Sequence, residues 1–181
     1  MLETLNPCAL SPQDALAISQ LRAVVWPPDN PNTPISPRKN APPYQGPPRQ
    51  FPATYIIRNF NGEIVAAAEV SPRAIRTTRG NEVIAALGGV CVRPDCRLLG
   101  YGSTLVRHCF DRIDHGDFSW ALFQTSKCAF YEKLGCEVIS NKIVNSLDKN
   151  PVRGPFFEDY AMVYPIGCAP VGDIDLLGGG Y

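Results

Sequence analysis

The sequence predicts an α+β fold that is rich in strands in its middle part. Short apolar runs bounded by turn residues recur from residue 54 onward, a pattern typical of strands. Near residue 105 the spacing becomes helical, so residues 84–124 read as a crossover of strand, helix and strand. A chain of 181 residues, 45% of them hydrophobic, has the size and apolar content of one domain, and we predict a single domain over residues 1–181.

Charge and hydropathy exclude several classes of protein. Seventeen basic residues balance seventeen acidic ones, which removes the positive surface that binding to nucleic-acid backbones requires. No apolar run reaches the ~20 residues of a membrane-spanning helix, and residues 1–10 lack the basic and apolar pattern of a signal peptide. We therefore expect a cytoplasmic protein that binds neither nucleic acid nor membrane.

The seven cysteines do not follow the pattern of a metal site or of a disulfide framework. Their number is odd and no C-x-x-C pair occurs. Most of them lie in apolar runs, as Cys109 does between Val106 and Phe110, where a reduced cysteine serves as a small hydrophobic residue. We predict buried, reduced thiols and no bound metal.

The first helix begins at S-P-Q-D, residues 11–14. Ser11 suits the N-cap, Pro12 the first helical position, and Asp14 the positive end of the helix dipole. Pro27 ends this helix and opens an irregular segment, residues 27–52, which holds ten of the 18 prolines. Prolines lack the backbone donor and force extended neighbours, so neither a helix nor a central strand forms there. An irregular stretch of this length in a small domain is typical of a functional segment.

Two strands follow, residues 54–59 and 63–70, joined by Asn61-Gly62, a preferred turn of tight hairpins. Residues 81–92 form a longer strand, in which Gly88-Gly89 predicts a bulge or a close approach to the backbone. From Gly102 we expect a helix that ends near residue 114. The elements predicted after it are a buried strand, a two-turn helix capped by Ser126, and two last strands: residues 118–124, 126–134, 137–143 and 160–164.

The most informative stretch lies between the long strand and that helix, and reads V-R-P-D-C-R-L-L-G-Y-G-S over residues 92–103. Glycines at 100 and 102 permit tight turns that leave several N–H groups unpaired at a helix N-terminus. The helix dipole adds partial positive charge at the same place, which favours a phosphate or pyrophosphate. A G-x-G pattern alone is weak evidence, because ordinary turns also satisfy it.

Two motifs together are more specific. Arg97-x-x-Gly100-x-Gly102, preceded by V-x-P and followed by a helix, resembles the acyl-coenzyme-A signature of the GNAT superfamily of N-acyltransferases. The segment F-Y-E-K-L-G-C, residues 130–136, resembles that family's F-Y-E-K-L-G-F, with Cys136 in the place of the usual aromatic residue. The resemblance covers about residues 85–139 most clearly. The tail, residues 178–181, is faintly similar to the aminoglycoside 2'-acetyltransferase branch, and nodulation acyltransferases are related.

The resemblance implies a GNAT-type fold with a central mixed, mostly antiparallel sheet that splays in the middle and is flanked by helices. It also implies acetyl-CoA as the cosubstrate. The splayed strand would expose N–H and C=O groups with which the amides of the pantetheine arm can pair. Leu98 stands where the family often has glycine. The residues expected to bind the cofactor are Val90, Cys91, Val92, Arg97, Leu98, Leu99, Gly100, Tyr101, Gly102 and Ser103.

Acyl transfer to an amine needs an oxyanion donor, an acid for the thiolate and a neutral amine. A backbone N–H within residues 90–92 suits the oxyanion, and Tyr131 falls on the family's general-acid position. The strand lacks the carboxylate that many relatives use as the base. Glu82, Glu69 and the terminal carboxylate of Tyr181 remain alternatives, and an amine that arrives neutral needs none of them.

We therefore predict an enzyme that moves an acetyl group from acetyl-coenzyme A directly to a primary amine of a small molecule. By the resemblance, residues 27–52 lie on the acceptor side, with Trp26, Tyr44 and Phe51 as candidate walls and Asp29 as a partner for the amine. The alternatives are a non-catalytic acyl-CoA-binding module and a transferase of longer acyl chains. A homodimer is compatible with these expectations.

Overall fold

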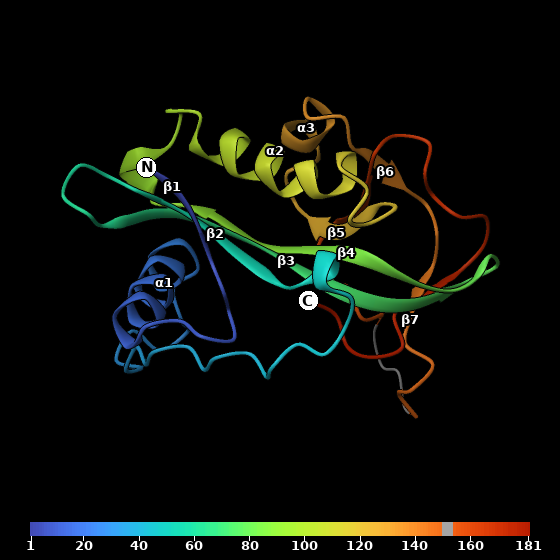
Figure 1. Cartoon of the computed structure of the whole chain (residues 1–181), viewed down its shortest axis with the longest axis horizontal. Coiled ribbons are helices and arrows are strands. Elements are labelled where there is room, and N and C mark those ends of the chain that lie inside the picture. Colours follow the sequence, from blue (N-terminus) through green and yellow to red (C-terminus); the bar gives the residue numbers. More distant parts are fainter. Residues whose placement is uncertain (150–153) are drawn as a thin grey trace. The chain divides into compact units, whose positions relative to one another are not determined.

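The computed structural model describes residues 1–149 and 154–181 (Figure 1). The chain forms two compact units. Unit 1 comprises Met1–Val70 and Gly89–Cys109, and unit 2 comprises Ser71–Gly88 and Phe110–Tyr181. Two strands and one helix contribute residues to both units: β3 (Ile64–Thr77), β4 (Gly80–Val92) and α2 (Tyr101–Asp114).

The sheet has the strand order β1-β2-β3-β4-β5-β8-β6, and β9 pairs with both β3 and β7. The pairs β1–β2, β2–β3, β5–β8 and β6–β8 are antiparallel, whereas β4 and β5 are parallel. This is the mixed, mostly antiparallel sheet that the sequence predicts. The remaining elements are α1 (Pro12–Val25), α3 (Cys128–Glu132), the short 3-10 turns η1 (Pro48–Gln50) and η2 (Pro94–Cys96), and the strands β1 (Leu2–Leu5), β2 (Ala53–Arg58), β5 (Ala121–Thr125), β6 (Glu137–Ile139), β7 (Ile143–Val144), β8 (Tyr160–Tyr164) and β9 (Ile174–Asp175).

In unit 1, helix α1 packs on one face of the sheet. Ser11 caps the helix as predicted, since its hydroxyl accepts a hydrogen bond from the Asp14 N–H. Ile18 is fully buried in a core cluster with Leu21, Ile56 and Ala67. Truncating such a residue to alanine typically costs about 2–5 kcal/mol, so Ile18 anchors α1 to the sheet.

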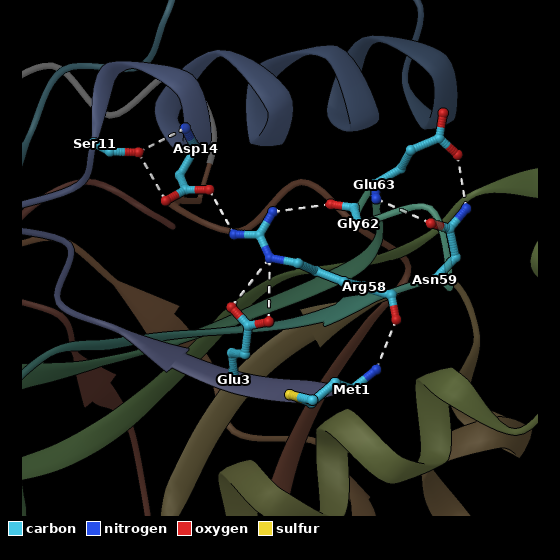
Figure 2. Close-up of polar contacts among 8 residues, drawn as sticks. All are labelled: Met1, Glu3, Ser11, Asp14, Arg58, Asn59, Gly62 and Glu63. Carbon is cyan, nitrogen blue, oxygen red and sulfur yellow. Dashed lines mark hydrogen bonds and ion pairs between the residues drawn. The ribbon is translucent and has the colours of Figure 1, made fainter.

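Arg58, at the end of β2, ties three parts of unit 1 together (Figure 2). Its guanidinium donates to both carboxylate oxygens of Glu3 on β1, to Asp14 on α1 at 2.6 Å, and to the carbonyl of Gly62 in the hairpin turn. The Met1 ammonium donates to the Arg58 carbonyl at 2.7 Å. These hydrogen bonds lower the pKa of Asp14 and raise that of Arg58, and they fix the register of β1 beside β2.

In unit 2, β5 lies between β4 and β8. A second core cluster collects on one of its faces, around Trp120 and Leu122. On the other face, Phe123 contacts the rings of Phe110 and Tyr131. Consecutive strand residues point to opposite faces, so β5 separates two differently composed environments.

The described register between β4 and β5 contains only two pairs, Ala85↔Ala121 and Ala86↔Leu122. β4 continues to Val92 and β5 to Thr125 beyond these pairs. This short pairing is consistent with the predicted splay, and it ends just before Gly88-Gly89, where Gly89 takes the left-handed φ of +59°.

Several predicted boundaries change. Strand β5 starts at Ala121 rather than 118, and residues 137–143 divide into β6 and the start of β7. Helix α3 is shorter than predicted, and its N-cap residue is Lys127, which makes no side-chain capping hydrogen bond, rather than Ser126. Strands β1 and β9 were not predicted, since each is short and exists through pairing with distant strands.

Candidate active site

The segment between β4 and α2 folds as a loop with free backbone donors. After η2, the chain passes through residues 97–100 into α2, whose first turn holds Gly102 and Ser103. Among the described residues, no protein acceptor receives a hydrogen bond from the main-chain N–H groups of residues 98–103. The N-terminus of a 14-residue helix therefore presents free donors together with the helix dipole.

Two residues of this loop adopt left-handed conformations. Gly100 has φ of +81°, and a Cβ placed on it would have nothing within 4 Å, so open space lies above this part of the backbone. Leu98 has φ of +65° with a fully exposed side chain. The left-handed region costs a non-glycine residue about 1–2 kcal/mol. Leu98 therefore adopts the conformation that glycine favours at this position and lowers the stability of the fold by that amount.

The end of β4 directs backbone groups away from β3. The Arg93 N–H donates to the Val65 carbonyl on β3 at 2.8 Å. Along a strand, successive N–H groups alternate between the two sides, so the Val92 N–H points away from β3. This is the side on which an added extended chain would pair, as we expected for residues 90–92.

A charged cluster stands on the α1 face of β4. The Arg22 guanidinium from α1 is 3.1 Å from Glu69 Oε1 on β3, and Arg38 from the proline-rich segment also forms an ion pair with this oxygen. Thr54 on β2, the register partner of Glu69, donates to the same carboxylate oxygen. Burial lowers the pKa of both guanidinium groups, although each keeps a fifth or more of its side chain exposed.

Gly89 accommodates this cluster. A Cβ built on it would overlap the Arg22 guanidinium, whose Cζ would be 3.2 Å away. Both its left-handed backbone and this close approach favour glycine. The close approach that Gly88-Gly89 predicts is therefore present, with an arginine side chain as the approaching group.

Tyr131, the predicted general acid, lies on α3 in unit 2 and is buried. Its ring is 4.6 Å from that of Phe123 on β5 and 4.8 Å from that of Phe130. These ring contacts restrict the orientation of the phenol, which suits a positioned acid. Its role as an acid stays a prediction.

The predicted bases Glu82 and Tyr181 contact the other face of β5. Both carboxylate oxygens of Glu82 already accept hydrogen bonds, one from Thr77 and one from the indole of Trp120 at 2.9 Å. The Tyr181 hydroxyl donates to the Leu122 carbonyl, and burial raises the pKa of this phenol. The two residues thus share the Trp120 and Leu122 side of β5, whereas Tyr131 packs on Phe123.

Four cysteines are buried as predicted, and three are only partly buried: Cys91, Cys96, Cys109 and Cys136 belong to the first group, and Cys8, Cys128 and Cys168 to the second. Burial raises the pKa of Cys91 to about 11 and that of Cys136 to about 12, which keeps both protonated at neutral pH. Because the thiolate is the nucleophilic form, neither residue suits a covalent acyl-enzyme. Among the described residues, no group of three or more metal-ligating side chains occurs.

The proline-rich segment is held against the rest of unit 1 at several points. The Ala41 N–H donates to the Pro7 carbonyl, and the Arg38 N–H reaches the Ala15 carbonyl on α1. Tyr44 and Phe51 line a hollow of about 510 Å³ beside β1, together with Thr4, Leu5, Asn6, Cys8, Pro43 and Pro52. A second hollow, of about 370 Å³, borders α1 and the β2–β3 hairpin, but its charged residues Asp14, Arg58, Glu63 and Arg93 already pair with one another or with neighbours.

Trp26 and Asp29, the other candidates for the acceptor side, lie exposed. Sequence reasoning missed Arg22 and Arg38. A signal for Arg22 existed, since it follows the buried Ile18 by four residues and so falls on the apolar face of α1, where an arginine needs a partner. No comparable signal existed for Arg38, because this residue lies in an irregular segment without a periodic pattern.

The splayed sheet and the loop of free N–H groups before α2 are the features of acyl-CoA N-acyltransferases. The sequence matches the Acetyltransferase (GNAT) family over residues 18–136, and the chain belongs to this family. It is therefore an acyltransferase that depends on acetyl-CoA, and the predicted fold, family and cosubstrate are confirmed.

Solved structures with the same fold agree. An acetyltransferase of Trypanosoma brucei is 21% identical with a TM-score of 0.53, over 78% of this chain and 96% of that chain. ElaA of Escherichia coli is 16% identical with a TM-score of 0.57, over 90% of this chain and 97% of that chain. YhbS of Escherichia coli, solved in complex with CoA, is 14% identical with a TM-score of 0.52, over 68% and 66% of the two chains. No curated protein matches this chain. No helix in the described residues is long and apolar enough to cross a membrane.

Proposed function

We propose that this enzyme transfers the acetyl group of acetyl-CoA directly to the primary amine of a small molecule, in the cytoplasm. The observation that carries the proposal is the set of unpaired N–H groups at residues 98–103, at the start of α2. Such groups suit a pyrophosphate, and the open space above Gly100 leaves room for it. The seven free thiols support a reducing compartment.

Each requirement of the reaction has a candidate in the chain. Acetyl-CoA supplies an activated thioester. The Val92 N–H, directed away from β3, is a fixed donor for the developing oxyanion, and Tyr131 is the proposed acid for the leaving thiolate. The amine loses a proton to solvent or arrives neutral, because Glu82 and Glu69 already accept hydrogen bonds or form ion pairs. The raised thiol pKa of Cys91 supports direct transfer over a covalent intermediate.

Calorimetric titration with coenzyme A tests the loop. Gly102→Val places a branched side chain in the first turn of α2, and we expect at least about a tenfold loss of affinity if the N–H groups hold the pyrophosphate. Arg107→Val places the same branched side chain at an exposed position further along α2 and serves as the control. Leu98→Ala should also leave the affinity nearly unchanged. Equal losses in all three variants would contradict the pyrophosphate site.

An acetylation assay against a library of amines, monitored by release of free thiol, tests the reaction. Turnover of one or more small amines supports the proposed transferase. Tight binding of coenzyme A without turnover of any amine would instead favour a binding module. A homodimer remains a prediction, which light scattering can test.

A further inference from the structure

We propose that Arg22 and Arg38 bind a carboxylate of the amine acceptor, so that the enzyme acetylates amines that also carry a carboxylate group. This inference rests on the proposed function and narrows its substrate class. Every residue that carries it belongs to unit 1: Arg22, Arg38, Thr54, Glu69, Gly89 and Cys91.

The first argument is charge. Two guanidinium groups share one carboxylate oxygen of Glu69, so the cluster has an excess of one positive charge. Cys91 also interacts electrostatically with Arg22. Its thiol does not supply a second negative charge, because its pKa is about 11 and it is neutral at physiological pH. A partly buried cation of this kind is stabilised when an anion pairs with it.

The second argument is an unused donor. Arg22 Nε is buried and donates to no acceptor among the described residues. A guanidinium presents its donors as a fork that matches a carboxylate. A ligand carboxylate can therefore accept hydrogen bonds from Arg22 that Glu69 does not accept. The side chains of Arg22 and Arg38 are 29% and 20% exposed, which leaves an approach from solvent.

The third argument is position. Arg22 lies against Gly89, one residue before the segment 90–92 that we expect to hold the thioester arm. Arg38 comes from the proline-rich segment, which we expect on the acceptor side. A carboxylate held there fixes one end of the acceptor next to the strand where transfer is proposed, and such positioning raises the effective concentration of the amine.

The test compares pairs of amines in which a carboxylate is replaced by a carboxamide, such as β-alanine with β-alaninamide and L-phenylalanine with its amide. Because the carboxamide lowers the pKa of the amine, kcat/KM is referred to the concentration of unprotonated amine for each compound. We expect kcat/KM for the acid to exceed that for the amide by about tenfold or more, as one charge-assisted contact provides. Arg38→Gln should reduce this ratio to near one, mainly through KM. Arg107→Gln, a change at an exposed arginine, should leave it unchanged.

A ratio near one in the native enzyme, or an equal loss for both members of a pair in Arg38→Gln, would overturn the inference while the transferase stands. If no amine is acetylated although coenzyme A binds, the proposed function fails, and a second measurement decides on the anion site. In that measurement, propionate but not propionamide at constant ionic strength should raise the Tm of the native protein and, by a larger amount, that of Glu69→Gln, in which the counter-charge is missing. The absence of this difference, or its persistence in Arg38→Gln, would refute the anion site.

Discussion

Replacing Gly89 with alanine is the most direct test of how β4 meets the arginine cluster. The left-handed φ of +59° costs an alanine about 1–2 kcal/mol. The new Cβ also displaces the Arg22 guanidinium from its pair with Glu69, and forcing such a shift in a packed region costs a further ~1–3 kcal/mol. We therefore expect a total loss of about 2–5 kcal/mol in the free energy of unfolding, which for a chain of this size lowers the Tm by roughly 2–4 °C per kcal/mol.

Urea unfolding of four variants separates the two contributions. Gly62→Ala is the matched control, because Gly62 has φ of +80° in the same unit and nothing within 4 Å of a Cβ, so it reports the backbone cost alone. In an Arg22→Ala background, Gly89→Ala should cost no more than this control. If Gly89→Ala and Gly62→Ala are equally destabilising in the native background, the close contact with Arg22 has no energetic role and the reasoning is refuted.

Three further predictions concern the reaction and the ionisable groups. Tyr131→Phe should lower kcat by ~10²-fold or more and leave the affinity for coenzyme A intact; unchanged turnover would remove Tyr131 as the acid. The lowered pKa of Asp14 stabilises the fold above the ordinary value of 3.8, and this contribution is lost as the pH falls below it; Asp14→Asn should therefore destabilise the protein at pH 7 and flatten the decrease in stability at acid pH, as denaturation curves will show. Finally, mass spectrometry after alkylation at pH 8 should find Cys91 unmodified in the folded protein, because its pKa is about 11; rapid labelling would contradict the buried, neutral thiol.

Local signals predicted the elements that depend on local chemistry. The cap at Ser11 and the left-handed Gly100 before α2 are present as predicted. The hairpin at Asn61-Gly62 also forms, but its turn is longer than the predicted two residues: the Asn59 N–H donates to the Glu63 carbonyl across residues 60–62, of which only Gly62 is left-handed. The change to helical spacing near Gly102 likewise predicted α2 to within one residue.

Features that depend on distant residues were not predictable in this way. β1 is a strand because it pairs with β2, more than 45 residues away, and its own sequence has no strong strand pattern. The cluster of Arg22, Arg38 and Glu69 joins a helix, an irregular segment and a strand, so no spacing in the sequence announces it. Glu82 was a candidate base in the sequence, but in the structure its carboxylate accepts a hydrogen bond from the indole of Trp120, a contact that the sequence did not predict.

The proline-rich segment has a consequence for self-association. β1 is the outermost strand on its side of the sheet and has only four residues, and the neighbouring chain that lines the hollow beside it contains Pro43 and Pro52. Proline has no backbone N–H to donate to a β-ladder. The segment that contains Pro43 and Pro52 therefore offers few hydrogen bonds to a strand added by a second molecule. Replacing these prolines would restore backbone donors beside the edge strand, and we expect such a variant to self-associate more readily than the native protein, as light scattering would show.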